Sequence, residues 1–336
     1  MSIKKLGEQT LKYKKPPIIN SYYSIVGPKE GKGPLGKYFD MVLDDDLIGQ
    51  KSWEKAERKM MFDASINAIK KSKFKVTDID FFIAGDLLNQ IISSSFAAKD
   101  LQIPFLGIYG ACSTFCQGLI FGSVLIDGGF ANNVLVATSS HFCTAERQYR
   151  YPLELGNQRP PTSQWTVTGS GAVVLSNSGK GLKVTYSTLG KILDFGLKDP
   201  NDMGSAMAPA AAHTIIQHFK DTGFTPKDYD LIVTGDLGVI GKDIASEIIS
   251  NQEYDISNVF SDCGTMIFTP SQDTHSGGSG CACSAVVSCG YIFREMEKGI
   301  FTRVLIVATG AMLSKASYLQ GESIPCIANA VTIESK

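Results

Sequence analysis

The segments GACSTFCQGLIFGSVLIDGG (residues 110–129) and GCACSAVVSCGYIFREMEKG (residues 280–299) repeat one pattern within a single chain. Each carries Ala-Cys-Ser near the start of a run whose apolar residues cover almost the whole circumference of a helix. A helix that is apolar all round is buried all round. We therefore predict two buried helices, one from each half of the chain, sandwiched between two sheets.

A second pair of segments supports the duplication. DIDFFIAGDL (78–87) and DYDLIVTGDL (228–237) agree at five of ten positions. Their short, β-rich apolar cores end in Gly-Asp, as expected of buried parallel strands. A helix candidate precedes each, at 52–71 with Ser52 as N-cap and at 205–223 with Gly223 at its end. The repeat predicts an α/β protein of two related halves.

The connection between the halves is expected near 178–182, within NSGKG. This position divides the chain into residues 1–180 and residues 181–336.

Composition limits the class of protein. The chain has 336 residues, 43% of them hydrophobic, and a net charge of −1, which points to a globular protein and predicts no nucleic-acid partner. The sequence shows neither a signal peptide nor an apolar run of about 20 residues, so a soluble chain is expected. The N-terminal lysines are expected to form a solvated arm, with contact to anionic lipid as the alternative.

The eight cysteines lie mostly in apolar segments and are expected to be reduced thiols. No pair of cysteines has histidines at zinc-binding spacing, so neither a structural metal nor a cofactor is predicted.

The stretch GACSTFCQGLIFGSVLIDGGFANNVLVATSS, followed by TVTGSGAVVLS, resembles the thiolase and ketoacyl synthase III superfamily. In that superfamily a cysteine at the place of Cys112 takes an acyl group from a thioester. The resemblance implies a five-layer αβαβα fold and a homodimer.

A narrower resemblance is to the stage V sporulation protein AD family, encoded among the spore dipicolinic acid transport genes. It implies binding of dipicolinic acid (pyridine-2,6-dicarboxylate), alone or with calcium, during sporulation and germination. It also implies a peripheral location at the spore inner membrane beside other subunits of the dipicolinate channel. The matching blocks are AGDLLNQ, GACST, ATSSH, AERQYRYP, VTGSGAVVLS, DMGSAMAPAAA, GGSGC and ESIPCIA.

The predicted position of Cys112 at a helix N-terminus favours its thiolate, because the helix dipole and unpaired N–H groups stabilise negative charge. Its counterpart Cys283 is expected to be a packing residue. Members of the synthase family carry a histidine after the strand that corresponds to DLIVT, but here the position is Gly235. His275 is the remaining candidate to face Cys112 and polarise a carbonyl. Full condensing activity is therefore disfavoured, and a Cys112-dependent, acyl-CoA-using condensing enzyme stays as the alternative function.

Dipicolinate is a flat aromatic dianion, so its site needs cationic or N–H donors and an apolar or aromatic wall. We expect one carboxylate beside Cys112 and the second on Arg147 or Arg150, with His141 or His275 assisting. The candidate ligand-binding residues are Asp86, Asn89, Cys112, Ser113, His141, Arg147, Arg150, His275 and Ser279.

Structural roles compete with several of these assignments. Asp86 and Asp236 each follow a strand and could cap a helix or close a loop, which is the favoured role for Asp236. His141 could be a hydrogen-bonded interface residue, and the two arginines could form surface ion pairs. His213 and His218 are expected to be ordinary packing or surface residues. The strand within TVTGSGAVVLS is expected to form an apolar edge that a second copy of the chain covers.

Overall fold

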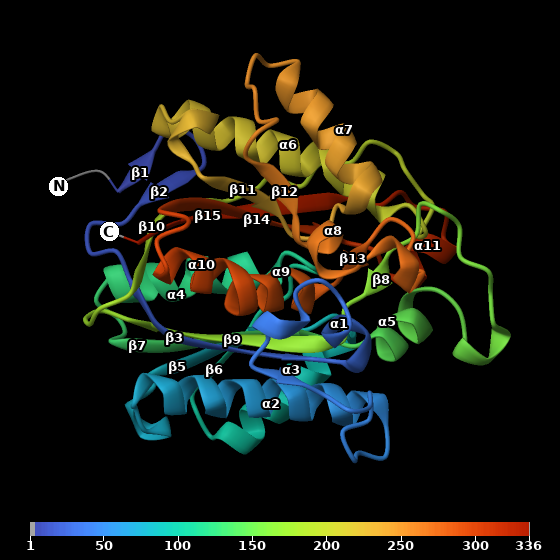
Figure 1. The fold of residues 1–336 in the computed structure, drawn as a ribbon, viewed down its shortest axis with the longest axis horizontal. Coiled ribbons are helices and arrows are strands. Elements are labelled where there is room, and N and C mark those ends of the chain that lie inside the picture. The colour runs from blue at the N-terminus through green and yellow to red at the C-terminus, as the bar shows by residue number, and fades with distance from the viewer. Residues whose placement is uncertain (1–3, 336) are drawn as a thin grey trace.

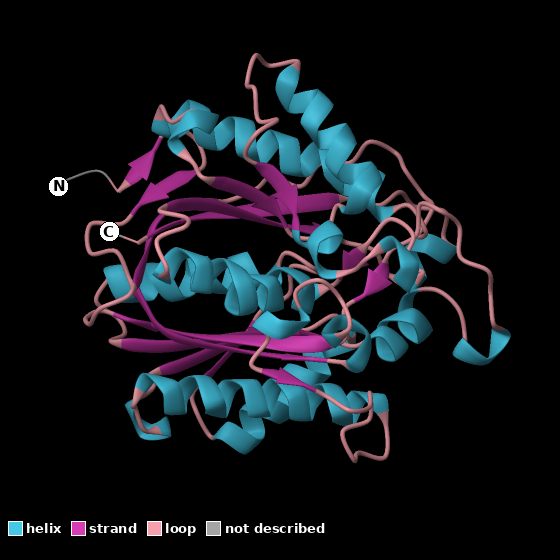
Figure 2. Ribbon diagram, viewed as in Figure 1, coloured by secondary structure: helices cyan, strands magenta, loops and turns pink. Residues whose placement is uncertain are grey.

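The computed structural model describes residues 4–335, and its strands and helices stack in five layers, αβαβα (Figure 1; Figure 2). Thirteen strands form one hydrogen-bonded sheet, which folds into two layers. The two layers meet where β10 pairs with β3 over only two residue pairs, Leu182 with Ile19 and Lys183 with Ile18.

Each layer repeats the same strand order. The first runs β3-β9-β7-β5-β6 and the second β10-β15-β14-β11-β12. In each, two antiparallel pairings are followed by two parallel ones. The strands are β3 (Ile18–Val26), β5 (Phe81–Gly85), β6 (Phe105–Gly107), β7 (Asn133–Ser140), β9 (Gly169–Ser176), β10 (Leu182–Thr188), β11 (Leu231–Thr234), β12 (Phe260–Asp262), β14 (Arg303–Ala311) and β15 (Cys326–Glu334).

The outer helices agree with the predicted ones. Helix α2 (Trp53–Ser72) begins after Ser52, whose side chain accepts a hydrogen bond from the Lys55 N–H. Helix α6 (Met203–Thr222) ends at Gly223. With α3 (Ile92–Leu101) and α7 (Gly238–Ser250), they cover the two outer sheet faces.

The two central helices lie between the sheets, as predicted (Figure 1). Helix α4 (Thr114–Asp127) is continuous. Its counterpart is not the single α-helix expected, because α9 (Cys281–Val287) passes through a π-helical turn over Ser288–Ile292 into α10 (Phe293–Glu297). The buried side chains of these helices, including Phe115 and Phe293, contribute to one core cluster with both sheets.

Short elements complete the chain. They are β1 (Lys5–Leu6), β2 (Thr10–Lys12), α1 (Pro28–Gly31), β4 (Met41–Val42), α5 (Phe142–Tyr149), β8 (Trp165–Thr166), α8 (Cys263–Ile267), β13 (Gly278–Ser279) and α11 (Lys315–Leu319). Among them, α5, β8, β13 and α11 contribute residues to the site.

The expected apolar edge at 166–176 is wrong. Strand β9 lies inside the sheet, between β3 and β7, and all eight of its residues are buried. The free edge of this layer is β6, where Phe105 and Leu106 are exposed. Hydropathy could not identify the edge, because an interior strand and an unpartnered apolar edge have the same composition.

Candidate functional site

Cys112 lies in a tight turn between β6 and α4, two residues before the helix begins. Ala111 has a left-handed φ of 48°, and the Ser113 N–H donates to the Gly110 carbonyl at 3.0 Å. A Cβ on Gly310 of β14 would lie 2.3 Å from that carbonyl, so only glycine lets the strand approach. The second half of the chain therefore helps to hold the Cys112 turn.

A buried polar group lies next to the Cys112 thiol. The Ser279 hydroxyl is 4.0 Å from Cys112 Sγ and donates to Asp236 Oδ2 at 3.0 Å. Asp236 also accepts hydrogen bonds from the Thr309 hydroxyl and, at 3.3 Å, from the Gly280 N–H. Asp236 therefore secures the loop before α9, as expected, and also brings a carboxyl group close to Cys112.

The prediction that Cys112 favours its thiolate is wrong. Burial raises the pKa of Cys112 well above its ordinary value, and the charge of Asp236 adds to the shift. Desolvation and a neighbouring carboxyl group outweigh the helix terminus. Cys112 is therefore a protonated thiol at neutral pH.

Cys281 is a neighbour of Cys112 that the repeat did not identify. Its Sγ donates to the Ala111 carbonyl at 3.0 Å, and it packs with Cys112, Leu87 and Ala145 in one small cluster. Cys283, which the sequence repeat pairs with Cys112, lies in the central core as a packing residue. The sequence Cys281-Ala282-Cys283 indicates that a second cysteine could lie near Cys112, but only the fold shows that this cysteine is Cys281.

Asp86 and Ser113 are occupied by local contacts. The Asp86 carboxyl group accepts hydrogen bonds from the Leu88 N–H at 2.9 Å and from the Ser94 N–H and hydroxyl at 2.8 and 2.6 Å. Burial nevertheless raises its pKa. The Ser113 hydroxyl donates to the Gly110 carbonyl at 2.7 Å and is buried. Both side chains shape the loops around Cys112 and line neither of the cavities described below.

None of the four histidines lines the cavity at Cys112. His141 caps α5: its Nδ1 accepts from the Cys143 N–H, and its Nε2 lies 2.8 Å from the Asp46 carbonyl. His275 is at the surface, 3.5 Å from Asp273, so the expectation that it faces Cys112 is wrong. His218 is buried between Thr188 and Tyr229, a packing role, as expected.

The two arginines of AERQYRYP have different surroundings. Arg147 is half exposed, pairs with Glu54, and has its guanidinium 5.4 Å from the centre of the Trp53 ring. The Arg150 side chain is only 6% exposed and pairs with Glu146 at 3.1 Å. Arg147 forms the expected surface ion pair, whereas the Arg150 pair is largely buried, and each arginine borders a different cavity.

A small cavity adjoins Cys112. Its volume is about 30 Å³, roughly the space of one water molecule. Cys112, Ser279, Arg150, Met203 and Tyr149 are among the residues that line it.

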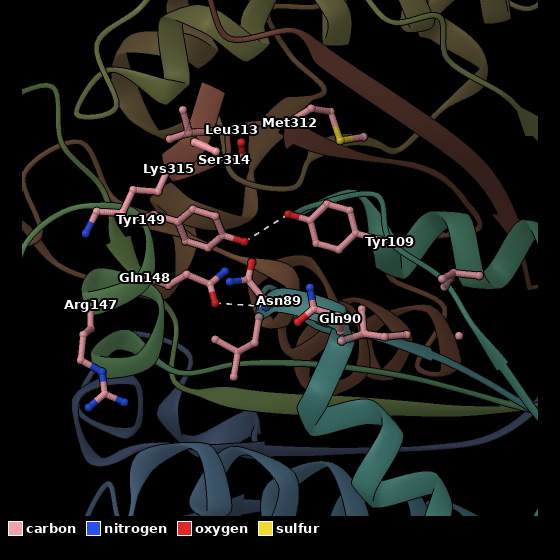
Figure 3. Close-up of a pocket in the computed structure, with 15 residues that line it drawn as sticks. Asn89, Gln90, Tyr109, Arg147, Gln148, Tyr149, Met312, Leu313, Ser314 and Lys315 are labelled. Carbon is pink, nitrogen blue, oxygen red and sulfur yellow. Dashed lines mark hydrogen bonds between the residues drawn. The ribbon is translucent and has the colours of Figure 1, made fainter. Parts of the chain in front are cut away.

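A cleft of about 720 Å³ lies outside this cavity and has Tyr109, Tyr149 and Leu313 in common with it. The Tyr109 and Tyr149 hydroxyls are 3.1 Å apart (Figure 3). The Tyr149 hydroxyl also donates to the Leu87 carbonyl. This tyrosine pair separates the cleft from Cys112. The other residues that line the cleft are Leu88, Asn89, Gln90, Ile91, Gly107, Ile108, Arg147, Gln148, Met312, Ser314, Lys315 and Ala316.

The polar rim of the cleft includes a strained segment. Gln90 and Ile91 both have left-handed φ angles, 57° and 47°, although neither is glycine. Such conformations cost free energy and are concentrated at functional sites. Asn89 is fixed next to them, because its N–H donates to Gln148 Oε1 at 3.0 Å.

The family model described as stage V sporulation protein AD matches residues 7–334 of this chain. The chain belongs to the stage V sporulation protein AD family. It is 50% identical to stage V sporulation protein AD of Bacillus subtilis (strain 168) over 332 residues, which cover 99% of this chain and 98% of that protein.

Solved structures similar to this family member are thiolase-like enzymes. One is 3-oxoacyl-[acyl-carrier-protein] synthase III of Aquifex aeolicus VF5, with a TM-score of 0.60, 13% identity, and coverage of 95% of this chain and 99% of that one. Another is a variant of Xanthomonas campestris OleA, with a TM-score of 0.61, 13% identity, and coverage of 98% of this chain and 99% of that one. Because the sequence identity is only 13%, the structural similarity to these enzymes shows that the chain has a thiolase-like fold and shows nothing about its activity.

Several residues of this stage V sporulation protein AD family member were missed in the sequence. Tyr109, Gln148 and Lys315 line the cleft but come from three separate segments. Tyr149 lies between Arg147 and Arg150, and the sequence gives no sign that its hydroxyl borders both cavities. Lys315 is the first residue of α11, where the sequence offers no local signal for a binding residue. No group of three or more metal-ligating side chains that could hold an ion occurs within residues 4–335.

Proposed function

We propose that this sporulation protein binds dipicolinate in the cleft lined by Arg147, Lys315 and the Tyr109–Tyr149 pair, and serves its uptake and release by the spore. The main support for this proposal is the difference in volume between the two cavities. The cleft of about 720 Å³ can hold a small aromatic acid, whereas about 30 Å³ beside Cys112 cannot. The ligand position is therefore proposed outside the tyrosine pair rather than against Cys112.

The chemistry of the cleft suits a flat dianion. Arg147 and Lys315 provide positive charge, and the amides of Asn89, Gln90 and Gln148 provide N–H donors. The ion pair of Arg147 with Glu54 is exposed and therefore weak, so its guanidinium can also bind a carboxylate. Lys315 has no carboxylate within 4.0 Å among residues 4–335. The tyrosine rings offer a wall for the pyridine ring (Figure 3).

Dipicolinate binding is expected to depend on both cations. Each of the substitutions Arg147→Ala and Lys315→Ala should weaken the affinity about tenfold or more, because each removes a charge-assisted contact of roughly 1.5–3 kcal/mol. Isothermal titration calorimetry, with and without calcium, measures the change. Lys15→Ala is the control, since Lys15 lies away from the cleft. Parent-like affinity in both cleft variants would show that the ligand binds elsewhere.

The alternative, an acyl-CoA-dependent condensing enzyme, requires a reactive Cys112. The glycine at position 235 cannot be a base, and any Cβ there would lie 3.1 Å from the Ala308 Cα. We expect incubation with acyl-CoA at neutral pH to leave the intact mass unchanged, because the raised pKa of Cys112 keeps the thiol protonated. An acyl adduct that disappears in Cys112→Ala would support the enzyme instead.

A homodimer is the second part of the proposal. Strand β6 is an unpaired edge with Phe105 and Leu106 exposed at 38% and 42%, and Ile92 and Phe96 of α3 are exposed at 39% and 40% beside it. An open apolar edge favours pairing with another strand. Gly107, Ile108 and Tyr109 continue from β6 into the cleft, so a second copy on this edge would border the ligand site.

The family resemblance supports a peripheral location at the spore inner membrane, where other subunits of the dipicolinate channel would be partners. No helix within residues 4–335 is long and apolar enough to cross a bilayer.

A further inference from the structure

Two exposed apolar side chains project from equivalent turns in the two halves. Phe130 is 74% exposed and Ile300 is 62% exposed. Each follows a glycine with left-handed φ, Gly129 at 79° and Gly299 at 77°, that ends a central helix. The Phe130 N–H donates to the Leu125 carbonyl at 2.8 Å, and the Ile300 N–H donates to the Glu295 carbonyl at 2.9 Å.

Both turns lie at the end of the molecule opposite the cleft. Helices α4 and α9–α10 begin close together, where Cys281 Sγ contacts the Ala111 carbonyl, and both extend toward the end where the chain termini emerge (Figure 1). Exposed apolar side chains there are not part of the core or of the ligand cleft.

Exposed lysines surround the Phe130 turn. The carboxylate of Asp127, in the last turn of α4, accepts the backbone N–H groups of Lys14 and Lys15 at 3.1 and 2.8 Å and pairs with Lys4 Nζ at 2.8 Å. The Lys12 N–H donates to the Lys4 carbonyl at 2.7 Å, which joins β2 to the same group. The Asn177 N–H donates to the Asn132 carbonyl at 2.9 Å, which brings the loop of Lys180 to the same turn. The exposed lysines are Lys4, Lys5, Lys12, Lys14, Lys15 and Lys180.

Five of the six lysines form no ion pair among residues 4–335. Lys4 is the one member with a carboxylate within 4.0 Å among residues 4–335. The nearby carboxylate of Asp80 accepts hydrogen bonds from the backbone N–H groups of Asn132 and Asn133. The carboxylate of Asp230 accepts hydrogen bonds from the backbone N–H groups of Thr302 and Arg303. Arg303 is paired with Glu334 at 2.6 Å. We call the six lysines together with Phe130 and Ile300 the basic end.

We infer that the basic end binds an anionic lipid surface, with Phe130 and Ile300 entering the interface and the lysines on the headgroups. This inference rests on the proposed peripheral membrane location and names the face responsible for it. Clustered lysines are attracted to anionic lipid, and exposed apolar side chains add shallow insertion. A nucleic acid is less well matched, because the group lacks a free arginine fork and Ile300 offers no stacking surface. The opposite end, with the ligand cleft, would then face the aqueous side.

Vesicle sedimentation tests the inference with the full chain. The parent should bind vesicles that contain phosphatidylglycerol and not vesicles of phosphatidylcholine alone, and added salt should weaken binding. Lys14→Glu with Lys15→Glu should lower the vesicle affinity at least tenfold, and so should Phe130→Ser with Ile300→Ser. The control for the lysine variant is Lys51→Glu with Lys55→Glu, because both of these lysines are exposed away from the basic end. The control for the apolar variant is Leu319→Ser, because the Leu319 side chain is 73% exposed and also lies away from the basic end.

Calorimetry with dipicolinate and thermal unfolding of the same variants keep the outcomes distinct. Parent-like dipicolinate binding and folding in the basic-end variants, together with lost vesicle binding, would support the inference. Absence of parent binding to anionic vesicles, equal loss in the control variants, or preferential binding to DNA or RNA would overturn it while leaving the dipicolinate proposal standing. Failure of the parent to bind dipicolinate would instead overturn the proposed function.

Discussion

Leu106→Asp is expected to convert the proposed dimer into a monomer. Leu106 lies in the middle of the exposed edge strand β6, where its counterpart in a second copy would bury it. A carboxylate at this place would be desolvated without a partner and would repel its symmetry mate, which costs several kcal/mol. Light scattering should give twice the 36.2 kDa chain mass for the parent and a single chain mass for the variant.

Phe195→Asp provides the control for this experiment. Phe195 is 66% exposed but belongs to the segment between β10 and α6, so the substitution should leave the mass of the assembly unchanged. A monomeric parent at micromolar concentration would contradict the dimer. A Leu106→Asp variant that stays dimeric would place the interface on another surface.

Glu30→Gln is expected to remove one contribution to the pH dependence of stability, beside those of the buried carboxyl groups of Glu57 and Asp262. Glu30 is fully buried, its Oε1 accepts the Thr168 N–H at 2.9 Å, and its Oε2 has no hydrogen-bond partner among the described residues. Burial raises its pKa to about 8. The folded protein therefore keeps this proton over a pH range in which the unfolded chain has lost it.

The sign of the effect follows from proton binding. Between about pH 4.5 and pH 8 the folded state binds more protons than the unfolded state, so the free energy of unfolding falls as pH rises and levels off above pH 8. Glu30 alone can account for up to about 5 kcal/mol of this loss. Asp262, whose pKa burial raises to about 7, contributes in the same direction.

Urea unfolding at pH 5 and at pH 8.5 measures this dependence in the parent and in Glu30→Gln. The variant should gain stability relative to the parent as pH rises. Glu154→Gln, at an exposed carboxyl group, is the control and should follow the parent. Parallel stability curves for the parent and Glu30→Gln would show that Glu30 is ionised in the folded protein.

The pattern of the sequence predicted most of the site's framework but not its chemistry. It placed Cys112 at the start of a buried helix, because Cys112 belongs to a repeated motif, but it expected His275 rather than Ser279 to face the thiol. It could not place the 720 Å³ cleft, since Tyr109, Gln148 and Lys315 meet only after three distant segments fold together. It also assigned the two arginines to one role, whereas burial separates them: Arg150 lies inside and Arg147 at the rim.

The sequence by itself determined the duplicated α/β fold, because hydrophobic periodicity and capping residues such as Ser52 and Gly223 act over short distances along the chain. Only the tertiary structure decided which strand is the free edge, β6 rather than β9, and whether Cys112 is ionised. Strand order depends on pairings between residues far apart in the sequence. The pKa of Cys112 depends on desolvation and on Asp236, which the fold brings from 124 positions away.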